Sequence, residues 1–366
     1  MSKNLPIRVL TLSLMVALVA GAPRELSAAS RSKRDSMAPI SVPDLELLGG
    51  RRLVFERTFT SDREVTVKRK FWTKVLDLVA GPPDLHNLVR PYSLAVDSTG
   101  RVIVTDPGLR GVHIFDFARQ KYKLIYRDGK EPFRSPQCVT VDADDNFYVT
   151  DSEAGKIFVF DADGKFRQVI GSLRGGEGYF KRPTGIAVDS VAQRIYVTDT
   201  LRQRIFVLDM QGSVLQSFGK GGTGPGEFNF PTELKLVDQK LYVVDAMNFR
   251  VQILDLSGKF LSQIGGGQDG SNEASASMFR PKGIAVDSEH NLYVVDGLGD
   301  QVQVVNPQGQ LLYYFGGTGS GPEQFQLPAG VFITPDDHIY VVDSYNRRVQ
   351  VLRYESPTQK AEVKKP

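Results

Sequence analysis

The sequence predicts an all-β fold assembled from six copies of one repeat. Each copy contains a short apolar run that ends in aspartate, such as Ile-Tyr-Val-Thr-Asp at 195–199. The closing aspartates follow one another at intervals of 45 to 51 residues, and they are Asp106, Asp151, Asp199, Asp245, Asp296 and Asp343. Repeats of this length that contain only strands and turns are typical of propeller blades. The predicted fold is therefore a six-bladed β-propeller of four-stranded antiparallel blades.

The third copy shows why each repeat should form four strands. Runs rich in Val, Ile, Phe and Tyr lie at 185–189, 195–199, 204–209 and 214–219, and each is bounded by Gly, Asp, Asn or Ser. β-Branched and aromatic residues favour strands, and the residues between them favour turns. The connections are short, so neighbouring strands should pair as antiparallel hairpins. We name the four strands a to d, from the inside of the blade to the outside.

The copies resemble the NHL repeat. Pro183 to Asp189 and Pro281 to Asp287 match Pro-x-Gly-Ile-Ala-Val-Asp, while Asn248 to Leu254 and Asn346 to Leu352 contain Asn-x-Arg-Val-Gln. The resemblance extends over about residues 90–353 and recurs in phase. NHL repeats form six-bladed β-propellers that commonly mediate protein interactions. The resemblance therefore implies the same fold and a role in binding.

The beginning of the chain has the three-part layout of a secretory signal peptide. Lys3 and Arg8 precede an apolar run at 9–20, and Ser27-Ala28-Ala29 offers small residues for cleavage. We predict that residues 1–29 are removed and that the protein is exported to the periplasm or the extracellular space. No integral membrane segment is then expected, although an uncleaved N-terminal anchor is the alternative.

The rest of the chain divides into a linker, a propeller and a tail. Residues 30–50 are polar and contain prolines, which predicts a flexible linker. The propeller is predicted at 51–354, and residues 355–366 should form a disordered tail.

The sixth copy lacks strand d, so its sheet needs an outer strand from elsewhere in the chain. Leaving that edge unpaired would invite association with other chains. We predict that residues 52–59 supply the strand and that 69–80 form a short helix, because that segment has one apolar helical face. The alternative closing strand is 74–81.

Strand direction assigns the loops to two faces of the propeller. The b–c turns and the long, glycine-rich d–a loops share one face, where function is expected to gather. Candidate binding residues in the b–c turns are Arg110, Lys156, Arg202, Arg204, Arg250, Arg347 and Arg348, and the d–a loops add Arg134, Lys181, Arg182, Arg280 and Lys282. These bases either form an anion-binding platform or pair with the strand-b aspartate of their own blade.

Glu233 is a further candidate binding residue, near the expected mouth of the central channel. It takes the strand-a position that Gly185 and Gly283 hold in other copies. A carboxylate there can bind calcium or act as a base, or it can pair with a nearby base. The histidines do not converge, with His290 and His338 in turns of the opposite face, so a His-ligated zinc site is not expected.

Composition narrows the function classes. Loss of three bases and one acid with the signal peptide lowers the formal charge from +3 to about +1, which disfavours nucleic-acid binding. The single cysteine, Cys138, should be a small buried hydrophobe and allows no intrachain disulfide. One cysteine also cannot build the zinc-binding modules through which some NHL proteins act as ubiquitin ligases.

The predicted function is an exported, non-catalytic scaffold that binds a protein or another anionic partner through the b–c and d–a face. A monomer is expected, without a catalytic residue, a metal site or a cofactor. The alternative is a metal-dependent propeller enzyme, hydrolase-like, lactonase-like or lyase-like, with a site at the channel mouth. In that case calcium is the expected ion and Glu233 the obvious candidate ligand or base.

Overall fold

A computed structural model describes residues 44–47, 50–65, 85–127, 131–173, 178–266 and 278–356. All of them belong to one compact unit of the chain, Val42–Pro366. The predicted signal peptide, the helix at 69–80 and the alternative closing strand at 74–81 lie outside the described residues, as do most of the predicted linker and tail. Within the described part, no helix has the length and apolar character needed to cross a bilayer.

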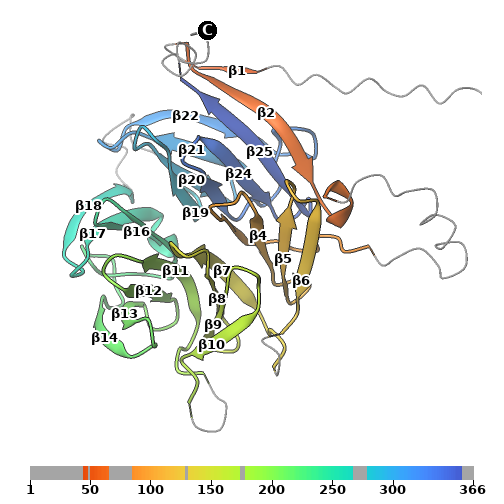
Figure 1. Ribbon diagram of the computed structural model, residues 1–366. Helices are drawn as coiled ribbons and strands as arrows, with labels where there is room; N and C mark the ends of the chain where they lie inside the picture. Colours follow the sequence, from red (N-terminus) through yellow and green to blue (C-terminus); the bar gives the residue numbers. More distant parts are fainter. Residues whose placement is uncertain are drawn as a thin grey trace, which may run out of the picture. The chain divides into compact units, whose positions relative to one another are not determined.

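Six antiparallel sheets form the blades of the predicted propeller (Figure 1). Blade 1 contains β3 (Ser93–Val96), β4 (Val102–Asp106), β5 (Gly111–Asp116) and β6 (Lys121–Ile125). Blade 2 contains β7 (Pro136–Val141), β8 (Phe147–Asp151), β9 (Lys156–Phe160) and β10 (Phe166–Ile170). Blade 3 contains β11 (Pro183–Asp189), β12 (Arg194–Asp199), β13 (Arg204–Asp209) and β14 (Val214–Phe218).

The second half of the chain repeats this arrangement. Blade 4 contains β15 (Pro231–Val237), β16 (Lys240–Asp245), β17 (Arg250–Asp255) and β18 (Phe260–Gly265), with the 3-10 helix η3 (Ala246–Asn248) in its b–c turn. Blade 5 contains β19 (Pro281–Val286), β20 (Leu292–Asp296), β21 (Gln301–Val305) and β22 (Leu311–Gly316). Blade 6 contains β23 (Val331–Ile333), β24 (His338–Asp343) and β25 (Arg348–Glu355).

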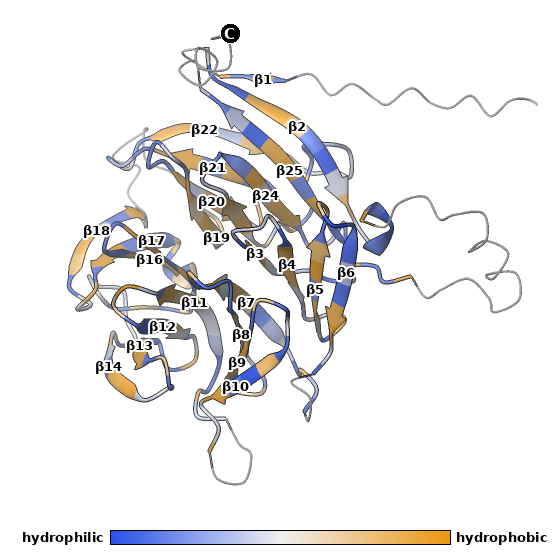
Figure 2. Ribbon diagram, in the orientation of Figure 1, coloured by the Kyte–Doolittle hydropathy of each residue, from blue (hydrophilic) through white to orange (hydrophobic). Residues whose placement is uncertain are grey.

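The inner strands contact one another in a closed cycle. β3 contacts β7, and the contacts continue through β11, β15, β19 and β23 back to β3. Six apolar clusters each join residues of two adjacent blades, so the core is divided among the blade interfaces. Figure 2 shows the resulting pattern within one blade, where β5 is largely apolar and the outer strand β6 carries hydrophilic residues. Burial of apolar surface between blades is the main force that holds such a ring together.

The sheet of blade 6 takes its outer strand from the N-terminal side of the chain. β2 (Arg52–Phe59) pairs antiparallel with β25, and the register places Leu53 opposite Tyr354. Leu53 and Phe59 are fully buried, and they belong to the clusters at the two sides of blade 6. After β2, the 3-10 helix η2 (Asp62–Glu64) begins with a capping box in which Ser61 and Glu64 exchange hydrogen bonds.

The predicted linker contains a strand. Leu45 and Glu46 were expected in the flexible segment 30–50, but they form β1 (Leu45–Glu46), which pairs antiparallel with the outer side of β2. The physical reason is that β2 offers an unpaired row of backbone donors and acceptors on that side. Blade 6 therefore has five strands.

Candidate functional site

Strand-b aspartates position the residues that enter strand a. In blade 5, Asp296 is fully buried, and its two carboxylate oxygens accept the amides of Phe279 and Arg280 at 2.9 and 3.0 Å. The same carboxylate accepts the amides of Leu298 and Gly299 in the b–c turn, both at 3.3 Å. One side chain therefore satisfies backbone donors both of the b–c turn and of a segment 16 residues before it in sequence.

In blades 1, 3 and 5, the strand-b aspartate accepts a hydrogen bond from the backbone amide of an arginine. The amides of Arg90 and Arg182 donate to Asp106 and Asp199, each at 3.0 Å, as the amide of Arg280 does to Asp296. All three arginines directly precede a proline at the entry to strand a. Because the backbone is held at the same point in blades 1, 3 and 5, these side chains approach the propeller axis from three directions.

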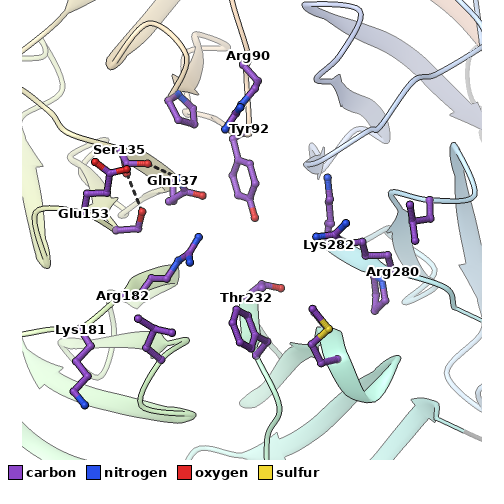
Figure 3. A pocket seen from close by; sticks show the side chains of 18 of the residues that line it. Arg90, Tyr92, Ser135, Gln137, Glu153, Lys181, Arg182, Thr232, Arg280 and Lys282 are labelled. Atoms are coloured by element: carbon purple, nitrogen blue, oxygen red, sulfur yellow. Dashed lines mark hydrogen bonds between the residues drawn. The ribbon is translucent and has the colours of Figure 1, made fainter.

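The arginines line a cavity of about 920 Å³, which we call the central cavity. Its lining comes from blades 1 to 5, and every lining residue lies in a b–c turn, in a d–a loop or at the start of strand a. Figure 3 shows Tyr92 and Arg182 extending towards the middle of the cavity from different blades, while Lys181 points away from it. The b–c and d–a loops therefore do share one face, as their order along the chain predicts.

The central cavity is strongly basic. Its basic lining residues are Arg90, Lys181, Arg182, Arg280 and Lys282. Glu153 is the only acidic residue among the described lining residues. None of the five basic side chains forms an ion pair or hydrogen bond with another described residue. Charges of one sign that lack local partners attract a ligand of the opposite sign.

Lys282 carries the clearest electrostatic signature of the cavity. Burial is the main cause that lowers the pKa of its ammonium group from 10.5 to about 8, and the positive charges of Arg280 and Arg90 add to this shift. The negative charge of Asp300 acts in the opposite direction and raises the pKa. Burial also raises the pKa of the nearby Tyr92 far above its usual range, so that its hydroxyl stays protonated at neutral pH. The site thus offers cationic donors and one neutral hydroxyl donor.

Glu233 lies on β15 beside the cavity but does not line it. It is buried, it accepts a hydrogen bond from Sγ of Cys138 at 3.3 Å, and Nζ of Lys235 lies 3.9 Å from its carboxylate. Burial raises the pKa of the Glu233 carboxyl, with Lys235 and Cys138 opposing the shift. Among the described residues, no group of three or more His, Cys, Asp or Glu side chains is arranged to hold a metal ion.

Two of the predicted binding residues hold their own blades together. Arg250 donates to Asp245 at 2.9 Å and to the carbonyl oxygens of Gly224 and Glu227 in the preceding d–a loop, each also at 2.9 Å. In blade 6, Arg348 repeats this pattern, with a 2.7 Å bond to Asp343 and further bonds to a d–a loop. Neither side chain lines the central cavity.

The other predicted b–c residues lie in different environments. Lys156 is buried and pairs with Glu131 at 3.0 Å rather than with its strand-b aspartate. Arg204 is exposed and donates to Ser217 at 3.3 Å, and Arg110 is an exposed turn residue with a φ of 55°. None of the predicted b–c residues lines the central cavity, whereas four of the bases predicted in the d–a loops do, namely Lys181, Arg182, Arg280 and Lys282.

Sequence reasoning did not single out Arg90 and Tyr92. The signal that points to Arg90 is the dipeptide Arg-Pro, which recurs in phase at 90–91, 182–183 and 280–281. No comparable repeat marks Tyr92, because the other copies have different residues at the same point of strand a.

Comparisons with known proteins agree with the observed fold. A family model of the NHL repeat matches residues 325–352, and a family model described as a 6-bladed beta-propeller matches residues 135–196 and 186–235. These matches and the six sheets define the chain as a six-bladed β-propeller with NHL-type repeats, which confirms the resemblance seen in the sequence. A search of curated proteins found no match.

Solved structures with the same fold have diverse descriptions. A catalytically inactive virginiamycin B lyase from Staphylococcus aureus with quinupristin is 16% identical, with a TM-score of 0.52 and coverage of 73% of this chain and 95% of that one. An auxiliary nutrient binding protein from Bacteroides thetaiotaomicron is 14% identical, with a TM-score of 0.57 and coverage of 74% and 71%. At such low identity, these similarities establish the fold alone.

Proposed function

We propose that this propeller is a binding protein whose central cavity holds an anionic partner. The observation that carries the proposal is the convergence of Arg90, Arg182 and Arg280 from alternate blades, together with Lys282, on one cavity. Guanidinium groups form paired hydrogen bonds with carboxylates and phosphates, so this arrangement suits a ligand that carries either group. Export and a monomeric state are part of the same proposal.

The electrostatics of Lys282 support this function. Burial is the main cause that depresses the pKa of Lys282 in the free protein, and repulsion by the neighbouring Arg280 and Arg90 depresses it further. A bound anion would relieve the repulsion and would favour the charged form of the lysine. The cavity is therefore arranged so that binding of a negative group improves interactions that are unfavourable in its absence.

A binding role is preferred over the enzyme alternative because of where Glu233 lies. This residue is the candidate base or calcium ligand, yet it is buried against Cys138 and is not part of the cavity lining. A general base has to reach the proton that it removes, within hydrogen-bond distance or through one water. The basic side chains that do line the cavity suit recognition of an anion.

The proposal can be tested by isothermal titration calorimetry with citrate and with pyrophosphate at low ionic strength. The wild-type protein should bind both anions, and added salt should weaken binding. Arg280→Gln and Lys282→Met should each lower the affinity by about tenfold or more, since each removes a charged donor. Arg204→Gln is the matched control and should leave the affinity unchanged. Absence of binding, or an equal loss in the control, would contradict the proposal.

A further inference from the structure

The face that holds the central cavity also exposes large apolar side chains at one repeated position. This position is the second residue after the strand-b aspartate. In blades 3 to 6 it is occupied by Leu201, Met247, Leu298 and Tyr345, which are 51%, 43%, 58% and 63% exposed. In blades 1 and 2 it is occupied by Gly108 and Glu153. The apolar character is therefore confined to four consecutive blades.

Two phenylalanines extend this surface at the edge of the central cavity. Phe249 and Phe279 are 43% and 62% exposed, and both line the cavity together with Leu201, Met247 and Leu298. We call these five residues and Tyr345 the apolar arc. Exposed large apolar side chains grouped around a polar site mark a place where a partner binds. The arc borders the basic cavity and continues beyond it, because Tyr345 does not line the cavity.

We infer that the anionic partner is a polypeptide segment that combines acidic and large apolar side chains. The inference rests on the proposed function and adds the chemical class of the partner. The acidic groups would occupy the central cavity, and the apolar side chains would cover the arc. Aromatic residues, Met and Arg are the side chains most enriched in protein interfaces, and the face presents all of them.

The dimensions of the site favour a polypeptide over a small anion. The cavity, at about 920 Å³, already reaches the upper end of the usual range for small-molecule sites, about 300–1,000 Å³. A ligand that fills it would still leave Tyr345 uncovered. An extended chain can place carboxylates over the cavity and, a few residues further on, apolar side chains over the b–c turn of blade 6.

A display selection with random peptides on the immobilised full-length protein tests the inference. Enriched peptides should contain Asp or Glu within a few residues of Leu, Phe, Met or Trp. A representative peptide should then bind at least about tenfold more tightly, by fluorescence anisotropy, than a version in which serine replaces its apolar residues.

Substitutions in the arc provide the matching test on the protein. The double variant Leu201→Ser, Leu298→Ser should lose about fivefold or more in peptide affinity. Tyr345→Ser should also weaken peptide binding but should keep the wild-type affinity for citrate, because Tyr345 does not line the cavity. Val191→Ser is the control, because Val191 is 94% exposed in an a–b turn on the opposite face. All four positions are solvent-exposed, so thermal unfolding should show that the variants fold normally.

The outcomes separate this inference from the proposed function. Citrate binding without any enrichment of acidic and apolar peptides would overturn the inference and leave anion binding in the cavity intact. Enrichment of acidic peptides whose affinity does not depend on their apolar residues would overturn it as well. Binding of octanoate that weakens in the double arc variant, without peptide binding, would assign the arc to a small amphiphilic anion instead. Absence of binding by both citrate and peptides would contradict both proposals.

Discussion

The amide of Arg280 donates a 3.0 Å hydrogen bond to Oδ1 of Asp296. This bond links the most regular feature of the sequence, the aspartate that ends strand b, to a side chain of the central cavity. The aspartate is buried and structural, whereas the arginine is exposed and available to a partner. The repeat that builds each blade therefore also positions the binding residues, and several predictions can be tested on that basis.

Asp296→Ala should destabilise the fold and weaken anion binding together. The change removes the acceptor for the amides of Phe279, Arg280, Leu298 and Gly299. Leaving such donors unpaired should lower the free energy of unfolding by about 2–4 kcal/mol, and citrate affinity should fall because Arg280 loses its anchor.

Urea unfolding and citrate titration of the same protein samples would measure both effects. Asp209→Ala is the matched control, because Asp209 accepts the amides of Gln211 and Ser213 in a c–d turn. Its carboxylate lies close to solvent, so the loss of stability should be clearly smaller than in Asp296→Ala, with citrate affinity unchanged. Equal losses in the two variants would contradict the role given to Asp296.

Arg250→Ala should be strongly destabilising, and Arg204→Ala should not. Arg250 is buried and its removal would leave Asp245 without its charged partner, which typically costs about 3–5 kcal/mol. Arg204 is exposed, so its loss should change the free energy of unfolding by about 0.5 kcal/mol or less. Denaturant melts would compare the two. Equal free energies of unfolding for the two variants would show that the Arg250–Asp245 ion pair contributes little to the stability of the fold.

Lys282→Met should stabilise the protein at neutral pH. The folded-state pKa of Lys282, about 8, lies below the 10.5 of an unperturbed lysine, so between these values the unfolded chain binds the proton more tightly. The contribution of Lys282 to stability therefore rises with pH from about 8 to 10.5. At pH 7 the variant should gain about 1–3 kcal/mol, and the gain should shrink above pH 8.

The same lysine predicts the pH dependence of binding. Citrate affinity of the wild-type protein should decline as pH rises through about 8, because the ammonium group loses its proton. The Lys282→Met protein should bind more weakly at pH 7 and should lack this decline, so the two affinities should approach each other at pH 9. Calorimetry at pH 7 and at pH 9 would measure the difference. A wild-type affinity that is constant across this range would contradict the assignment of Lys282 to the site.

Leu53→Ala should weaken the attachment of β2 to blade 6. Leu53 is fully buried in the cluster between blades 5 and 6, and truncation of a buried leucine costs about 2–5 kcal/mol. Glu56→Gln is the control, since Glu56 is an exposed residue of the same strand. Thermal unfolding followed by circular dichroism would compare the two variants. An equal midpoint would mean that β2 contributes little to the fold.

Much of the architecture could be predicted because it depends on local patterns. Six in-phase aspartates, four apolar runs per copy and short turns predict the blades, and the order of strands predicts which loops share a face. The need for an outer strand in blade 6 could also be predicted, because the sixth copy lacks strand d and a strand-like segment precedes the first copy. β1 was missed because a two-residue strand has no periodicity, and it depends on the free edge of β2.

The roles of the basic residues could not be assigned from their spacing alone. Arg204 and Arg250 follow their strand-b aspartates by the same distance, yet only Arg250 forms the ion pair. The difference comes from the preceding d–a loop, since Arg250 also binds carbonyl oxygens of residues 224 and 227, and Asn248 binds the loop at Gly222. Whether a base is structural or available thus depends on the conformation of a distant loop.

The central claim is that an anion binds among Arg182, Arg280 and Lys282. The most direct test is a crystal of the protein soaked in tungstate, followed by an anomalous difference map. The account predicts a peak in the central cavity within contact distance of these side chains, and its loss in crystals of the Arg280→Gln variant. A cavity without tungstate, in crystals that bind the anion elsewhere, would contradict it.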